Sequence, residues 1–165
     1  MHTLWVQFFD ALTTLHARAK EVEVIESIID ALAGCVEQLG ADGMTEQEVV
    51  QIVAIISYQL RKHEKRRLRY KPKKGKQADN ARLLFLKGME NEILARISEA
   101  IHNLFKVFGK AFFDHMEPLI PNFLQLIDLK RTYQSRQYGV CYIVDCIEFA
   151  SKVRNELVCL GFLFF

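Results

Sequence analysis

Half of the 165 residues are hydrophobic and a quarter are charged, a composition typical of folded globular proteins that excludes a disordered chain. The net charge of +2 conceals an asymmetry. Residues 61–76 hold ten basic residues and one acidic residue (+9), whereas the rest of the chain holds 12 basic and 19 acidic residues (−7). No segment reaches the roughly 20 apolar residues that span a bilayer, and the N-terminus lacks the basic flank of a secretory signal.

The first half of the chain predicts three helices. The first covers 2–18, where apolar residues recur every three or four positions. The second covers 21–39 and ends at Gly40, a residue type favoured just after a helix. The third begins at Thr45, which forms a capping box with Glu48, and it runs into the basic tract. The apolar positions of the first helix are Leu4, Trp5, Phe8, Phe9, Leu12 and Leu15.

The second half predicts three more helices. The fourth covers 90–108, and residues 79–88 form at most a short helix before it. The fifth covers 112–127, and its prolines predict a break near 116–119. The sixth covers 134–150, with its buried positions at Tyr138, Cys141, Tyr142, Val144, Cys146 and Ile147.

Residues 21–40 and 90–109 have the same apolar pattern when one is shifted by 69 positions onto the other, including Gly40 onto Gly109. Such self-similarity indicates a repeat array. The fourth and sixth helices are about 42 residues apart, within the ~40–47 residues of a HEAT or armadillo repeat. The prediction is therefore an all-α, HEAT-repeat (armadillo-like) solenoid of about six helices over 1–165, with a basic loop inserted at about 61–88.

Three segments carry a family resemblance: 92–105 (EILARISEAIHNLF), 116–121 (MEPLIP) and 135–149 (SRQYGVCYIVDCIEF). The last is similar to the helix DRQW-G-L-C-I-F-D-D-V-I-E of the importin-beta (karyopherin-beta) nuclear transport receptors, with Tyr138 in place of its Trp. Residues 32–40 also resemble a helix end of that family. The resemblance covers about 19–151 and is to the large receptors that carry ribosomal proteins and histones, of which this chain would be an internal fragment.

The resemblance implies binding of cargo proteins and of Phe-Gly proteins of the nuclear pore, and localisation in cytoplasm and nucleus. Ran binding is expected only of a full-length receptor. The chain departs from the family where an acidic insertion is replaced by the basic tract. It departs again at 152–165, an apolar end that we interpret as a truncated repeat. Because a cut array exposes apolar faces, we expect aggregation or dimerisation.

The basic tract is the candidate electrostatic binding site, either for nucleic acid or as a nuclear localisation signal, and the alternative is a solvated loop without a ligand. Its residues are Arg61, Lys62, Lys65, Arg66, Arg67, Arg69, Lys71, Lys73, Lys74 and Lys76. His63 is expected at the surface.

No catalytic, cofactor or metal motif stands out. The five histidines lack ligand spacing. The four cysteines are expected to be buried and reduced: Cys35, Cys141, Cys146 and Cys159. The aromatic residues are expected in the core. We therefore expect no enzyme and no cofactor. The function expected is nuclear import of cargo, and the alternatives are a basic helical nucleic-acid-binding protein or a non-transport HEAT-repeat scaffold.

Overall fold

The computed structural model describes the backbone of residues 2–69 and 77–161, and the side chains of 3–63, 65–66 and 84–151. Within these ranges the regular structure is helical, and no strand is present. The long helices are α1 (His2–Arg18), α2 (Val22–Leu39), α3 (Glu46–Arg69), α4 (Gln77–Phe108) and α7 (Tyr133–Gly161). Between α4 and α7 lie α5 (Lys110–Met116), the 3₁₀ turn η2 (Glu117–Leu119) and α6 (Ile120–Leu126). A second 3₁₀ turn, η1 (Ala41–Gly43), joins α2 to α3.

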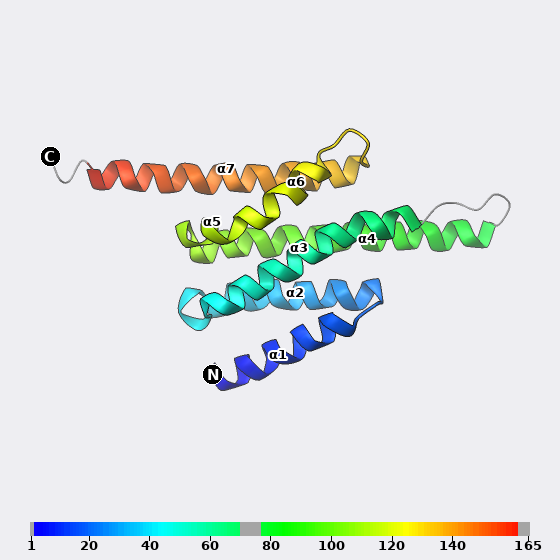
Figure 1. The fold of residues 1–165 in the computed structure, drawn as a ribbon, viewed down its shortest axis with the longest axis horizontal. Coiled ribbons are helices and arrows are strands. Elements are labelled where there is room, and N and C mark those ends of the chain that lie inside the picture. Colours follow the sequence, from blue (N-terminus) through cyan, green and yellow to red (C-terminus); the bar gives the residue numbers. More distant parts are fainter. Residues whose placement is uncertain (1, 70–76, 162–165) are drawn as a thin grey trace.

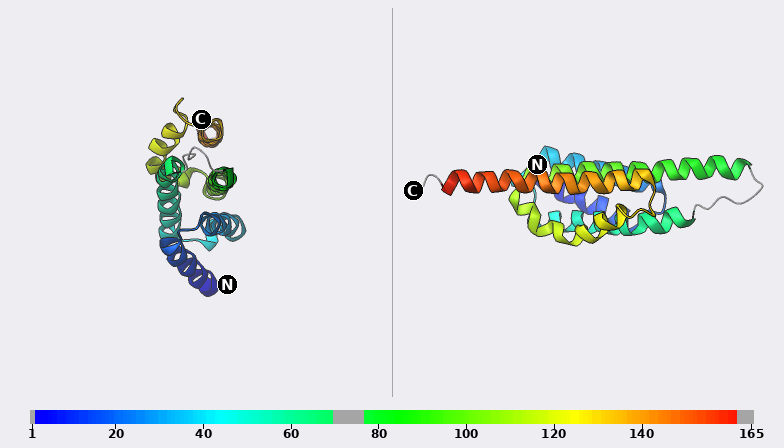
Figure 2. Two further views of the ribbon diagram at one scale, coloured as in Figure 1. Left: turned by 90° about the vertical axis from the view of Figure 1, so that its right-hand side faces the viewer. Right: turned by 90° about the horizontal axis from the view of Figure 1, so that it is seen from above.

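The helices form two layers that alternate along the chain. One layer contains α2, α4 and α7, which lie side by side and run in the same direction (Figure 1). The other contains α1, α3 and the interrupted helix α5–η2–α6 (Figure 2). Helices that follow one another from one layer to the other are antiparallel, so the described chain stacks the pairs α1–α2, α3–α4 and α5–η2–α6 with α7 into an open array rather than closing around one centre. This is the arrangement of a HEAT-type solenoid, and the predicted fold class is confirmed.

The predicted helix starts and ends follow from local chemistry. The Glu48 carboxylate accepts hydrogen bonds from the Thr45 amide (2.6 Å) and hydroxyl (2.8 Å), and the Glu48 amide donates to the Thr45 hydroxyl oxygen (3.3 Å). This reciprocal pair is the predicted capping box. The α2 and α4 helices both end at a glycine with positive φ, +66° at Gly40 and +51° at Gly109. Because side chains are strained at such φ values, glycine is the residue that lets both copies turn at the same place.

The core includes the apolar positions that the two copies share. Ile25 and Leu94, Ile28 and Ile97, Leu32 and Ile101, and Val36 and Phe105 are all at most 4 % exposed. They belong to one hydrophobic core that also includes Ile52 and Ile56 of α3 and Phe112 of α5. Trp5, Phe9 and Leu12 of α1 are also buried, as the helical pattern predicted.

The structure changes several predicted boundaries. The expected loop over 61–88 is helical at 61–69, in α3, and at 77–88, in α4; residues 70–76 lie outside the described part. The predicted short helix at 79–88 is continuous with α4, because Gly88 in a helix interior lowers stability without forcing a break. The break near Pro118 is confirmed as η2. The predicted sixth helix is longer than expected, since α7 continues to Gly161.

The prediction of buried positions was wrong at several residues. In α7, Tyr142 is buried and Tyr138 and Cys146 are half-buried, but Cys141, Val144 and Ile147 are exposed. In α1, Phe8 was expected in the core with the other aromatic residues but is exposed, as are Leu4 and Leu15 of the same stripe. The reason is that periodicity identifies a shared face but not whether a neighbour covers it. Leu4, Phe8 and Leu15 of α1 line open pockets beside α2 rather than a closed interface.

Candidate functional site

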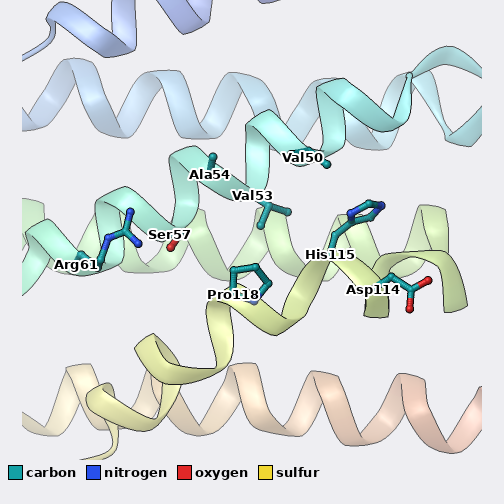
Figure 3. Close-up of a pocket in the computed structure, with 8 residues that line it drawn as sticks. All are labelled: Val50, Val53, Ala54, Ser57, Arg61, Asp114, His115 and Pro118. Atoms are coloured by element: carbon teal, nitrogen blue, oxygen red, sulfur yellow. The ribbon is translucent and has the colours of Figure 1, made fainter.

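A groove separates α3 from the next helix of the same layer, α5–η2 (Figure 3). It has a volume of about 330 Å³. Arg61 lies at one end, and Asp114 and His115 lie toward the other (Figure 3). The lining between them is mostly apolar: Val50, Val53, Ala54, Ser57 and Pro118. The groove is therefore a shallow apolar channel with a cation at one end and a carboxylate near the other.

Two local features build this groove. Pro118 lies in the first turn of η2, where its missing N–H is tolerated, and it interrupts the helix beside α3. Asn122 of α6 then donates to the Ser57 hydroxyl oxygen and to the Pro118 carbonyl, both at 3.3 Å. These bonds fix the interrupted helix against α3. The sequence signalled the break but not the groove, because the groove requires the relative position of two helices.

A larger apolar pocket of about 500 Å³ lies between α1 and α2. It is lined by Leu4, Trp5, Phe8, Ala31, Gly34, Cys35, Gln38 and Leu39. The indole N–H of Trp5 is buried and has no hydrogen-bond acceptor among the described residues. We name this cavity the α1–α2 pocket.

The residues of the predicted basic patch differ in how accessible they are to a ligand. Arg61 and Lys65 are exposed, and the Lys62 ammonium lies 5.1 Å from the centre of the Tyr58 ring. Arg66 is not available to a ligand, because its guanidinium donates to Glu90 and, at 2.8 Å, to the Gln59 side-chain oxygen. Arg67 and Arg69 belong to α3, but their side chains lie outside the described part, as do all of Lys71, Lys73 and Lys74; of Lys76 nothing is described either.

The prediction that His63 is a surface residue was wrong. His63 is 2 % exposed, and its Nδ1 lies 3.0 Å from the Glu90 carboxylate. Its Nε2 lies 3.3 Å from the hydroxyl oxygen of Ser135, at the start of α7. The Glu90 carboxylate therefore contacts both His63 and Arg66, and together with Ser135 these residues form a buried cluster that joins α3, α4 and α7. Sequence reasoning missed this cluster because its members are 27 and 72 positions apart.

A second polar connection joins α1 to this cluster. The His16 Nε2 lies 2.7 Å from the side-chain nitrogen of Gln59, whose oxygen accepts from Arg66. Burial, and then the nearby positive charge of Arg66, lower the pKa of His16. The neutral form is therefore favoured, and its Nε2 can accept a hydrogen bond from Gln59.

Ion pairs cross the seam between α2 and α4. Arg96 contacts Glu26 (2.8 Å), Asp30 (3.1 Å) and, on its own helix, Glu99 (3.2 Å). Hydrogen bonds to Glu26 and Glu99 raise the pKa of Arg96, so it stays charged. Lys106 contacts Glu37 at 3.0 Å. The seam holds these four carboxylates against two cations, a surplus of two negative charges.

The cysteine thiols were predicted to be buried, and the structure contradicts this at Cys141. Cys35 and Cys146 are half-buried, and burial raises the pKa of both, that of Cys146 to about 11. Cys146 also donates to the Met116 sulfur at 3.0 Å. Cys141 is exposed, so its predicted burial was wrong. The side chain of Cys159 lies outside the described part.

Among the described residues, no group of three or more His, Cys, Asp or Glu side chains is placed to hold a metal ion. No helix in the described part of the chain has the length and hydropathy to cross a membrane.

The chain matches a known protein family. The family model described as "Importin repeat 6" matches residues 24–128. The match begins in α2, includes α3, α4, α5 and η2, and ends just after α6. It thus covers both the α2–α4 seam and the groove between α3 and η2.

Proposed function

Because the chain belongs to the importin-beta family of nuclear transport receptors, we propose that it binds cargo proteins and takes part in their import through the nuclear pore, moving between cytoplasm and nucleus. In this proposal the protein recognises and carries its cargo and catalyses no reaction. The observation that supports this most directly is an open, two-layered helical array with an apolar groove between successive helices of one layer. Such arrays present extended surfaces for binding.

The groove between α3 and η2 is the proposed site for Phe-Gly segments of pore proteins. Its volume of about 330 Å³ is at the lower end of the ~300–1,000 Å³ of ligand pockets. It therefore accommodates an aromatic side chain rather than a folded element. Val50 and Ala54 are accessible on its rim. Shallow contacts of this kind suit weak, rapidly reversible binding during passage.

The α2–α4 seam is the proposed cargo surface. Its surplus of carboxylates favours a basic cargo segment, because opposite charges guide encounter and fix register. Asp30 and Glu99 have side chains that are 50 % exposed, so they can still contact a partner while paired with Arg96. The basic end of α3 would repel such a cargo, which directs it to the seam.

The experiment is a titration of the chain with a Phe-Gly repeat peptide and with the same peptide carrying Ser in place of Phe. Binding of the first and not the second is expected. Ala54→Glu places a charge in the groove and should weaken binding about tenfold or more, since a buried charge without a partner is costly. Ala11→Glu on α1 is the matched control, exposed but outside the groove. Equal affinity for both peptides, or no effect of Ala54→Glu, would leave a non-transport scaffold as the better description.

A nucleic-acid-binding role is the second candidate, supported by the +9 charge of residues 61–76 and by the exposure of Arg61 and Lys65. Replacing Arg61, Lys62 and Lys65 by Gln, with Arg66 retained for its contact with Glu90, removes cations without opening the buried cluster. If these side chains neutralise phosphates, the slope of log affinity for RNA against log salt should fall by about 2 to 3. An unchanged slope would exclude these three residues from the interface.

A further inference from the structure

The groove between α3 and α5–η2 continues beyond the hollow described above into a second hollow. The second hollow has a volume of about 340 Å³ and lies between the start of α3, the end of α4 and α5. Asp114 and His115 line both hollows, so the two hollows meet at these side chains. Helices of the described chain bound the groove on both sides, so it lies within the array rather than on an outer face. The other residues of the second hollow are Glu46, Val49, Phe108 and Ala111.

A single stripe of α3 forms one wall of the whole groove. At a rise of 1.5 Å per residue, the stretch of α3 from Glu46 to Arg61 is about 22 Å long. An extended peptide advances about 3.3–3.6 Å per residue, so about six or seven residues would cover this length. The groove therefore has the length of a short extended segment rather than of one side chain. The residues of the stripe are Glu46, Val49, Val50, Val53, Ala54, Ser57 and Arg61.

The two ends of the groove carry opposite charges. At one end are the carboxylates of Glu46, whose side chain is 82 % exposed, and of Asp114, which is also exposed. Glu46 lies 3.8 Å from the His115 imidazole, a long contact that leaves most of the carboxylate open to solvent. At the other end Arg61 is exposed, and it has no ion-pair partner among the described residues. Because the lining between the ends is mostly apolar, a bound segment would meet charge chiefly at its two ends.

We propose that the groove binds an extended peptide with a basic residue at the Glu46 and Asp114 end, an acidic residue at the Arg61 end and apolar side chains between them. Opposite charges at the two ends fix the position of the peptide along the groove, which a neutral peptide does not achieve. This specificity rests on the proposed function of the groove as a site for Phe-Gly segments, and it adds the flanking charges that distinguish one such segment from another. Since the charged groups of the groove are exposed, each ion pair contributes modestly and binding stays reversible.

The test is a fluorescence anisotropy titration of the complete 165-residue chain at low salt with three peptides. The peptides have blocked ends and share one Phe-Gly core, flanked by Ser at both ends, by Lys first and Glu last, or by Glu first and Lys last. Both charged orders are needed, because the groove determines which end takes which charge but not the direction of the peptide backbone. The tighter of the two charged peptides should bind about three- to tenfold more tightly than the Ser peptide, since exposed ion pairs are weak. This gain should shrink as salt is raised.

Variants assign the gain to the two ends of the groove. The double variant Glu46→Gln with Asp114→Asn, and separately Arg61→Gln, should each remove part of the gain and leave the affinity for the Ser peptide within about twofold. Arg61→Lys keeps the charge and should keep the gain. Asp10→Asn with Glu92→Gln is the matched control, because it removes the same two kinds of carboxylate from exposed positions outside the groove. Circular dichroism checks that the variants remain folded.

The outcomes separate the charge specificity from the function on which it rests. If the Ser peptide binds and neither charged peptide binds more tightly, the charged ends play no part; the proposal is then overturned while Phe-Gly binding stands. The same conclusion follows if the gain survives both the loss of the two carboxylates and the loss of the Arg61 charge. If none of the three peptides binds, the groove is not a peptide site, and both proposals fail.

Discussion

Glu90→Ala is the substitution with the largest expected effect on stability. The Glu90 side chain is 2 % exposed and is the shared acceptor for His63 and Arg66. Without its carboxylate, the Arg66 guanidinium, 14 % exposed, keeps only Gln59 as a described partner. Removing one partner of a buried ion pair costs about 3–5 kcal/mol. Because Arg66 lies near the end of α3 and retains some solvent contact, we expect the lower limit, about 3 kcal/mol.

Urea denaturation followed by circular dichroism measures this loss. With an m-value of about 1–3 kcal/mol/M, a loss of about 3 kcal/mol moves the midpoint down by about 1–3 M. Glu90→Gln keeps an oxygen for Arg66 and should lose less. Glu26→Ala is the control from the partly exposed seam, where Arg96 keeps Asp30 and Glu99 and the cost should stay below about 1 kcal/mol. If Glu90→Ala and Glu26→Ala differ by less than about 0.5 kcal/mol, the buried cluster does not hold the three helices together.

Two further predictions concern a glycine pair and a histidine. Gly139→Ala should destabilise the chain, because the added Cβ would lie 2.8 Å from the Ile127 side chain and 2.9 Å from that of Leu126. The overpacking should cost about 1–3 kcal/mol, which offsets or exceeds the gain of about 1 kcal/mol from alanine's higher helix propensity. Gly34→Ala is the matched control: its Cβ would meet no atom within 4 Å, so urea denaturation should show only the gain. The pKa of His16 is lower in the folded chain than in the unfolded chain, so below about pH 6.5 the unfolded chain binds more protons. The stability that neutral His16 contributes is therefore complete above about pH 6.5. It is lost as the pH falls through the lower pKa of the folded state. His16→Gln should flatten the pH dependence of the urea midpoint below pH 6.5, and an unchanged profile would show that other groups cause it.

Local signals in the sequence were sufficient for much of the fold. The Thr45–Glu48 capping box and Gly40 depend on neighbours in the chain, and each appears in the structure as predicted. The repeated apolar pattern of α2 and α4 gave the helix pairs and their order. Each of these features is decided within one or two helical turns, which is the range over which sequence patterns are informative.

The features that the sequence did not reveal depend on partners far along the chain. His63 lies in a run of charged residues beside Glu64, a setting typical of a surface, yet Glu90 and Ser135 enclose it. The exposure of Val144 and Ile147 has the converse cause: an apolar stripe identifies a face, and only the presence of a neighbour decides its burial. The groove between α3 and η2 depends in the same way on the relative position of two helices.

The exposed cations of α3 lie away from the carboxylates of the α2–α4 seam because of where the chain places the extra residues between α2 and α4. The shift from α2 to α4 is 69 positions, about 27 more than from α4 to α7, yet the Ala33–Asn103 and His102–Asp145 contacts keep one register. The additional residues therefore lengthen the end of α3 and the start of α4 rather than displacing the seam. The first turns of α4 extend beyond the neighbouring ends of α2 and α7 (Figure 1). The exposed cations at the end of α3 and the carboxylate surplus of the seam thus occupy different parts of the array, so a basic partner at the seam and an anionic partner at the tip need not compete.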